Sequence, residues 1–290
     1  MLMVAVTLMW SIAGVVTRWL EAARGFEITF WRSAVCAVVL VPVLAWMRGP
    51  RVLWDRVRGG DRAFWIGSVC WAIMFTAFML ALSLTTVANV LITLALGPLF
   101  TALASRIALH HRLPRRTWVA IGVAGLGIAW MYGSQVGLAG ARHVAGVLVA
   151  LCVPVAGATN WTLMQHLHHG DDEPDDMLPA VMVGGVLSSL ATLPLALPLQ
   201  ASAHDIGLLA LLGVLQLAIP CLLAMSLTRV LKAPEISLLA LLEVVFGVLW
   251  AWLGAGEAPS LAVLGGGALV LGALVTNELL TLTGTERHPG

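Results

Sequence analysis

The sequence predicts an all-α membrane protein with ten transmembrane helices, arranged as two inverted five-helix repeats. The composition is apolar, with 60% hydrophobic and 11% charged residues and a mean hydropathy of +0.94. Soluble domains have about 45–50% apolar and about 25% charged residues. Apolar runs of about 20 residues, the length that crosses a bilayer core about 30 Å thick, follow one another along the chain. The second half also repeats segments of the first.

The first five predicted spans lie in a repeat at residues 1–135. Short segments with Gly, Pro and charged residues separate the apolar runs and favour turns, as at Arg48-Gly49-Pro50 and Gly59-Gly60-Asp61. The chain begins with an apolar run that has no basic segment before it, so we expect the first span to be retained. The predicted spans are 1–20, 28–47, 63–83, 86–109 and 117–132.

The second five predicted spans lie in a repeat at residues 143–281, followed by a cytoplasmic tail at 282–290. Turn signals again separate the apolar runs: an acidic connection at 171–176, Lys232-Ala233-Pro234 and Ala258-Pro259. None of the connections is long enough to form a soluble domain. The predicted spans are 143–167, 177–199, 206–231, 234–254 and 259–280.

The distribution of Lys and Arg predicts the orientation, because positive residues near span ends remain in the cytoplasm. With ten spans, 12 of the 16 Lys and Arg residues fall on one side of the membrane. Three, Arg18, Arg24 and Arg142, fall on the other side, and Arg32 lies inside a span. We therefore expect both termini to be cytoplasmic.

Residues 79–100 superpose on 225–246 at a constant offset of 146. Gly122 and Gly127 fall on Gly267 and Gly272 after a one-residue slip. Because each half has five spans, an odd number, the second half starts on the opposite side of the membrane. Inverted repeats are typical of transporters that bind substrate near the midplane and alternate access by rocking one half against the other. We expect the glycine-rich segments to pack within each half, in a monomer, with a dimer as the alternative.

Several short segments, taken in order, resemble the EamA family of the drug/metabolite transporter superfamily over the whole chain. Val244 departs from the family pattern, because a Pro usually follows the Glu of the ninth span, and His110-His111 replaces the Gly-Glu that usually closes the fourth span. The segments that carry the resemblance are Trp10-Ser11, Phe30-Trp31-Arg32-Ser33, residues 97–103, Arg116-Thr117-Trp118, residues 242–246 and Gly256-Glu257.

This resemblance implies a transporter in the inner membrane of a bacterium that exports amino acids. The nearest branch is that of the aromatic amino-acid exporters, so the expected cargo is aromatic and other neutral amino acids. Export of drugs or other small metabolites on the same fold is the alternative.

Two ionisable residues, Arg32 and Glu243, lie clearly inside predicted spans. Each costs about 2.5–3.5 kcal/mol to insert, so each needs a partner or a use. Glu243 could accept a proton or pair with a substrate amine; a structural contact to backbone or hydroxyl groups is the alternative. Arg32 lies about one turn below the outer face, and we expect it to snorkel to the headgroups rather than bind a ligand.

Polar and aromatic side chains in other spans complete the expected substrate site in a midplane cavity between the repeats. Interhelical hydrogen bonding, worth about 0.6 kcal/mol on average, and core packing are the alternatives for each residue. Pro98, Pro154 and Pro220 interrupt apolar runs, and we expect Pro98 and Pro154 to act in gating. The predicted substrate-binding residues are Trp10, Ser11, Met79, Asn89, Thr93, Asn160, Trp161, Gln216 and Glu243.

Other classes of function are disfavoured by the residues. The formal charge of +1 and the lack of a basic tail argue against nucleic-acid binding. The scarcity of charge inside the spans argues against a channel, and no nucleophile and base lie together as an enzyme would need. The histidines at 166, 168 and 169 lack metal-ligand spacing. We expect no cofactor and no metal; the expected partners are a small-molecule substrate, an amino acid, and the lipid bilayer.

Overall fold

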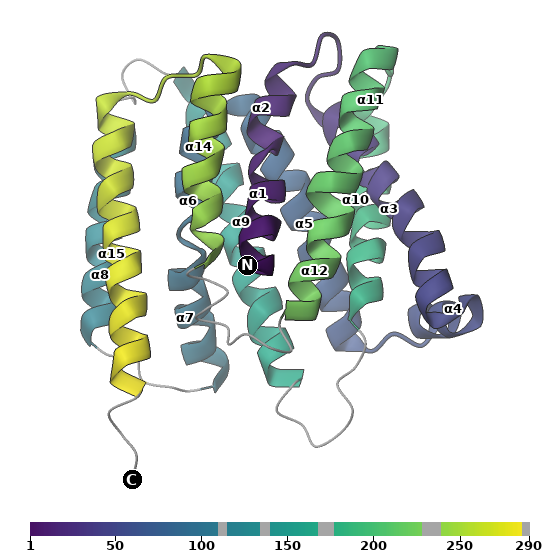
Figure 1. Cartoon of the computed structure of the whole chain (residues 1–290), viewed down its shortest axis with the longest axis horizontal. Helices are drawn as coiled ribbons and strands as arrows, with labels where there is room; N and C mark the ends of the chain where they lie inside the picture. The colour runs from purple at the N-terminus through teal and green to yellow at the C-terminus, as the bar shows by residue number, and fades with distance from the viewer. Residues whose placement is uncertain (110–114, 134–139, 168–176, 228–238, 286–290) are drawn as a thin grey trace.

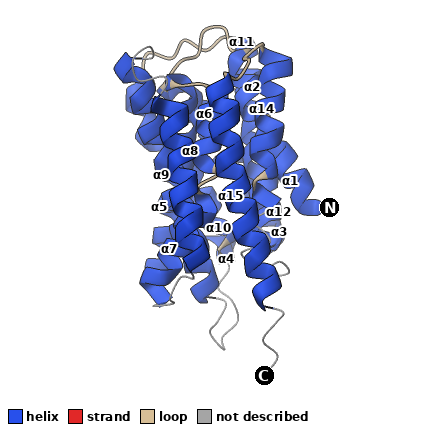
Figure 2. Ribbon diagram, turned by 90° about the vertical axis from the view of Figure 1, so that its left-hand side faces the viewer, coloured by secondary structure: helices blue, strands red, loops and turns tan. Residues whose placement is uncertain are grey.

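The structure is a computed structural model that describes residues 1–109, 115–133, 140–167, 177–227 and 239–285. All regular elements in these ranges are helices, which stand side by side in one bundle (Figures 1 and 2). Six helices are long and apolar enough to cross a membrane, and four apolar helices of 10–17 residues are shorter. The predicted all-α class is confirmed for the described residues, whereas the count of ten spans stays a prediction.

The first half contains helices at each of its five predicted spans, two of them divided. The first is divided at Ile12 and the fourth at residues 95–96. A helix that we had not predicted occupies the connection after residue 49; Pro50 at its first position favours this start. The helices are α1 (Leu2–Ser11), α2 (Ala13–Arg18), α3 (Phe26–Arg48), α4 (Pro50–Arg58), α5 (Arg62–Leu84), α6 (Val87–Leu94), α7 (Gly97–Leu109) and α8 (Arg115–Gly133).

The regular elements among the described residues of the second half are also helices. Its third span is continuous from Ala203 to Leu227 but contains a π-helical segment, and its last helix continues five residues beyond the predicted end at residue 280. The elements are α9 (Gly140–Leu167), α10 (Leu178–Ala196), α11 (Ala203–Leu211), η1 (Leu212–Ala218), α12 (Ile219–Leu227), α14 (Leu242–Ala255) and α15 (Leu261–Thr285). The following predicted features lie outside the described residues: His110-His111, His168 and His169, the acidic connection 171–176, Lys232-Ala233-Pro234, and the tail from residue 286.

Helices of the two halves pack against each other in matched pairs. Three contacts, α3 with α10, α6 with α14 and α8 with α15, join helices that correspond under the predicted repeat. Two further contacts occur twice: α5 packs on α9 as α12 packs on α1, and α7 packs on α9 as α14 packs on α1. Two equivalent halves would produce this pattern, while the repeat boundaries at 1–135 and 143–281 stay a prediction.

Two glycines, one in the last helix of each half, lie between the halves. A Cβ placed on Gly127 of α8 would lie 2.8 Å from the carbonyl oxygen of Gly266 in α15. A Cβ on Gly267 would lie 2.8 Å from Cδ1 of Ile92 in α6. The expectation that the glycine-rich segments pack within each half is therefore wrong for Gly127 and Gly267. Their lack of a side chain lets helices of opposite halves approach closely.

At the upper end of the bundle in Figure 1, two buried carboxylates hold backbone N–H groups of the opposite half. Asp205, at the start of α11, accepts hydrogen bonds from the N–H groups of Glu21, Ala22 and Ala23 at 2.8–2.9 Å. Glu27, in the first turn of α3, accepts from the N–H groups of residues 200 and 201 at 2.8 Å. These bonds join the connection after α2 to the start of α11.

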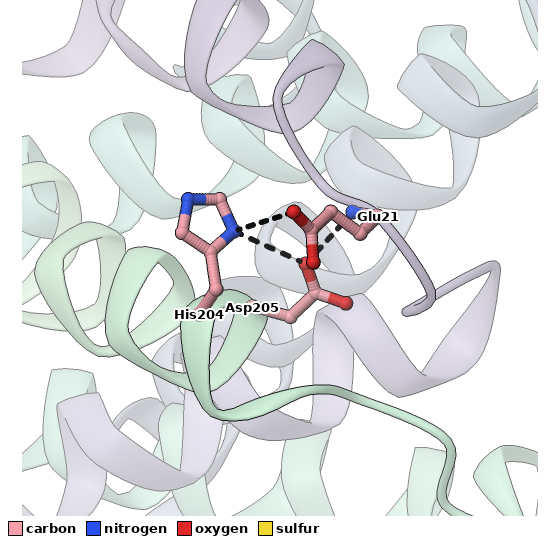
Figure 3. Close-up of side chains that lie close together, drawn as sticks. All are labelled: Glu21, His204 and Asp205. Carbon is pink, nitrogen blue, oxygen red and sulfur yellow. Dashed lines mark hydrogen bonds and ion pairs between the residues drawn. The ribbon is translucent and has the colours of Figure 1, made fainter.

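Glu21 and His204 lie next to Asp205, and the three could be taken for a metal site (Figure 3). The geometry favours a clamp, because both Asp205 oxygens already accept backbone hydrogen bonds and Asp205 also forms a capping box with Ser202. The Nδ1 atom of His204 lies 3.8 Å from Asp205 and 4.0 Å from Glu21. Both His204 and Glu21 are exposed, so their ion pairs contribute little.

A second group of polar contacts joins the halves at the same end. Arg18 forms an ion pair with Glu257 at 3.1 Å and donates to the carbonyl oxygens of residues 82 and 85. Glu257 also accepts from the N–H of Val87 at 2.8 Å. The Trp19 indole donates to the carbonyl of Gly254 at 3.0 Å. Polar groups of both halves thus close the upper end of the bundle.

We expect Asp205→Ala to lower the free energy of unfolding by about 3 kcal/mol, because it leaves buried N–H groups without their charged acceptor. Denaturant unfolding in detergent, followed by tryptophan fluorescence, would measure the change. His204→Ala is the matched control, since His204 is exposed and only borders the same carboxylate. Equal, small effects of both substitutions would show that the clamp does not hold the two halves together.

Candidate functional site

Arg32 in α3 is the largest fully buried side chain, and its guanidinium lies among first-half and second-half residues. Nη1 donates to Oε1 of Gln216 at 2.7 Å, and Nη2 donates to the carbonyl oxygen of Phe75 at 2.7 Å. The guanidinium carbon is 5.9 Å from the ring centroids of Phe75 and Phe78. Its Nε has no hydrogen-bond partner, and no carboxylate of the described residues forms an ion pair with it.

The depth of this group follows from its partners. Phe75 lies nine residues before the upper end of α5 at Leu84, which is about 14 Å at 1.5 Å per residue. A bilayer core is about 30 Å thick, so the guanidinium lies near its middle. Arg32 is 0% exposed, and the expectation that it snorkels to the surface is wrong. The Gln216 amide, a main-chain carbonyl and two aromatic faces supply interactions inside the bundle instead.

Gln216 reaches Arg32 from a π-helical segment of the second half. In η1 the N–H of Ile219 bonds the carbonyl of Val214, five residues back instead of four. Pro220 follows directly and has no N–H to bond the carbonyl of Gln216 four residues before it. The proline was visible in the sequence as a helix interruption, and the structure places the irregular turn just before it. The π-helix thus sets the position from which Gln216 meets Arg32.

Close approach of α3 to η1 is what allows this contact. A Cβ placed on Gly213 would lie 2.8 Å from the carbonyl oxygen of Arg32 and 2.9 Å from Cβ of Val35. Only glycine leaves that space empty. The glycine one helical turn before Gln216 therefore lets the two helices bring Arg32 and Gln216 together.

Glu243 lies in the first turn of α14, 12 residues before the upper end of this helix at Ala255, or about 18 Å. It is partly exposed and forms no hydrogen bond or ion pair with the described residues. Cys221 of α12 is close enough to interact electrostatically with both Glu243 and Arg32, and Trp10 packs against the apolar cluster that contains Cys221. An arginine of the first half and a glutamate of the second half thus both lie near Cys221, around the middle of the bundle.

Other predicted site residues lie closer to the bundle ends. Asn89, in the first turn of α6, contacts Nε2 of His143 at 2.7 Å and donates to Oγ1 of Thr85 at 3.2 Å. Thr93 donates to the carbonyl of Asn89 within the same helix at 2.7 Å. Asn160 is fully buried seven residues before the lower end of α9, and its amide has no hydrogen-bond partner among the described residues. The structure therefore does not bring the asparagines together with Arg32 and Glu243.

Three more predicted residues have contacts typical of packing. Ser11 donates to the carbonyl of Leu8 one turn earlier at 2.8 Å. Met79 is 1% exposed within the core of α5. The ring of Trp161 stands edge-on to Trp71 with centroids 6.2 Å apart, and Trp71 itself is buried.

The two predicted gating prolines occupy different settings. Pro98 is the second residue of α7, directly after the break that separates α6 from α7. Pro154 is buried inside α9, which continues on both sides of it. A break between two helices thus precedes Pro98, whereas α9 continues through Pro154.

Sequence reasoning missed Glu27 and Asp205, which lie just before the apolar runs that predicted the second and eighth spans. The signal for Asp205 was present as Ser202-Ala203-His204-Asp205, the spacing of a capping box. An acidic residue in the first helical turn, as Glu27 is in α3, is typical of a helix N-terminus. That their partners come from the opposite half could not be read from either pattern.

Comparison with known proteins identifies a matching family and a solved structure of similar fold. The model of the EamA-like transporter family matches residues 1–133 and 144–277, one match in each half of the chain. No curated protein sequence matches the chain. A solved crystal structure matches with a TM-score of 0.66 and 18% sequence identity, covering 99% of this chain and 98% of its own. At that identity the likeness shows the fold alone.

The contact between α3 and η1 predicts a difference between two glycines of one helix. We expect Gly213→Ala to lower the free energy of unfolding by about 1–3 kcal/mol, as overpacking does, because the new methyl group would meet the backbone of Arg32. Gly207→Ala should leave it unchanged or raise it by up to about 1 kcal/mol, because nothing lies within 4 Å of a Cβ there. Thermal unfolding of both variants in detergent would decide; equal stabilities would contradict the close approach.

Proposed function

Because the chain belongs to the EamA-like transporter family, we propose that it exports aromatic and other neutral amino acids across a bacterial inner membrane. Members of this family are transporters of the drug/metabolite type and not enzymes. Export would proceed by alternating access around a midplane site between the two repeats. Export of drugs or other small metabolites on the same fold is the alternative.

One observation carries the choice of an amino acid. Arg32 from the first half and Glu243 from the second half both interact electrostatically with Cys221, and they form no ion pair with each other. An amino acid at neutral pH carries a carboxylate and an ammonium group. The carboxylate of such a zwitterion would meet the guanidinium of Arg32 on one half, and its ammonium group would meet the carboxyl group of Glu243 on the other. An uncharged drug would leave the charge of Arg32 uncompensated.

Aromatic side chains in the same part of the bundle support an aromatic cargo. The indole of Trp10 lies beside Cys221, and its side chain packs in two of the apolar clusters of the core. The ring of Trp71 contacts those of Trp161 and Phe75, and Phe75 also faces the guanidinium of Arg32. Aromatic rings offer offset-stacked and edge-to-face contacts to a substrate ring. The indole and phenyl groups would surround the side chain of the amino acid while its charged groups bind Arg32 and Glu243.

Alternating access gives the polar contacts at the upper end a role. The clamp at Asp205, the acceptor at Glu27 and the ion pair between Arg18 and Glu257 each join one half to the other. If the halves rock, these contacts must form when the upper end closes and separate when it opens. With the predicted orientation, the upper end is the outer one, and the arrangement corresponds to a transporter closed toward the outside. The break before Pro98 would let α6 and α7 move separately.

Counterflow in liposomes tests the proposed function. Liposomes that contain the purified protein would be loaded with unlabelled amino acids. Labelled tryptophan, phenylalanine, threonine, methionine or glutamate would then be added outside. We expect saturable accumulation of the aromatic and other neutral amino acids and little of glutamate. If the folded protein exchanges none of these amino acids, the proposal of amino-acid export is wrong, and drugs or other metabolites remain as the cargo.

We further expect Glu243→Gln to reduce this accumulation about tenfold or more, since a hydrogen bond to a charged group contributes about 1.5–3 kcal/mol. Glu21→Gln is the matched control, because Glu21 is exposed at the upper end and the same chemical change there leaves the midplane untouched. Unchanged counterflow in Glu243→Gln would remove Glu243 from the substrate site.

A further inference from the structure

The charge of Arg32 is only partly satisfied in the structure. Its two hydrogen-bond acceptors, the Gln216 amide and the Phe75 carbonyl, are both neutral. The Nε–H has no acceptor although the side chain is 0% exposed. A guanidinium has five N–H donors in a planar fork that fits a carboxylate with two parallel hydrogen bonds. A buried cation with spare donors and no anionic partner among the described residues is suited to receive an anion from a ligand.

The Gln216 side chain occupies the position that such an anion would need. Its Oε1 lies 2.7 Å from Nη1 of Arg32, the distance of a strong hydrogen bond. An amide oxygen has the shape of half a carboxylate but no negative charge. A carboxylate in its place would gain the full attraction of the buried cation, because charge interactions are stronger inside the bundle than in water.

The backbone at Gln216 forms an irregular turn that can change its conformation. The π-helical turn of η1 contains one residue more than an α-helical turn, and Pro220 leaves the carbonyl of Gln216 without its usual N–H donor. An irregular turn can shift its register while the regular helices on each side remain intact. Because Arg32 belongs to the first half and Gln216 to the second, this hydrogen bond also ties the halves together near the midplane.

We infer that Gln216 is a stand-in for the substrate carboxylate: the carboxylate displaces Gln216 from Arg32 and thereby releases a bond between the two halves. This inference rests on the proposed function and assigns the carboxylate-binding residue of the transported amino acid. Occupancy of the site is then coupled to the relative movement of the halves, because Arg32 exchanges a protein partner for a substrate partner. A ligand without a carboxylate leaves the Arg32–Gln216 bond in place.

Binding can be measured without transport, by the shift in melting temperature of the purified protein in detergent. The probes are phenylalanine, its amide phenylalaninamide, and 3-phenylpropionate, which keeps the carboxylate but lacks the amine. We expect phenylalanine and 3-phenylpropionate to raise the melting temperature of the wild-type protein and phenylalaninamide to leave it unchanged. Counterflow of phenylalanine would be followed in parallel.

Gln216→Glu is the decisive variant, because it supplies Arg32 with a permanent carboxylate of nearly the same shape. Without ligand, we expect this variant to melt at a higher temperature than wild type. Phenylalanine and 3-phenylpropionate should no longer raise its melting temperature, and its phenylalanine counterflow should fall about tenfold or more. The two carboxylates should also fail to raise the melting temperature of Arg32→Gln, but this variant should melt at a lower temperature than wild type.

The outcomes separate this inference from the proposed function. If 3-phenylpropionate raises the melting temperature but no amino acid is exchanged, the carboxylate site at Arg32 is supported and amino-acid export is overturned. Exchange of phenylalanine with equal stabilisation by phenylalaninamide, or with an unchanged response in Gln216→Glu, would keep export and overturn the inference. Stabilisation by none of the carboxylates would also overturn it.

Discussion

A guanidinium held near the middle of an apolar bundle constrains much of the surrounding structure. Arg32 cannot reach water, so the protein must bring it acceptors: a carbonyl of α5, an amide of η1 and two phenyl rings. Those contacts require α3 to lie close to both α5 and η1, which the glycine at 213 permits. The acceptors are neutral, so the cation retains an attraction for an anion that no described residue satisfies.

Polar contacts of the bundle fall into two groups with different consequences. At the upper end, Asp205, Glu27 and Glu257 accept several hydrogen bonds from main-chain N–H groups or an arginine of the opposite half. Near the midplane, Arg32 and Glu243 have fewer partners among the described residues. Polar groups with a full set of partners stabilise one arrangement of the halves, whereas groups with few partners can gain free energy by binding a ligand. This contrast is the physical reason for proposing a substrate at the midplane and a closure at the upper end.

Much of the fold was predictable because apolar run length and turn residues report directly on helices in a membrane. The runs at 28–47 and 63–83 closely match α3 and α5. The amphipathic α4 was missed because its charged residues made the segment resemble a loop. Trp10, Gln216 and Glu243 were predicted for the substrate site and lie near the midplane, but Asn89 and Asn160 lie toward opposite ends of the bundle. Residue type alone does not report depth when a polar group lies near the end of an apolar run.

By itself, the sequence determined the helical class, the order of the helices and the two in-membrane charges, since these follow from local composition and from the cost of burying polar groups. The tertiary structure decided which partners those charges obtain. Arg32 turned inward instead of to the headgroups because Gln216, 184 residues further along the chain, reaches it from a π-helical turn. Gly127 of α8 and Gly267 of α15 likewise pack across the halves. Such contacts depend on how distant segments are arranged in space, which the local sequence does not indicate.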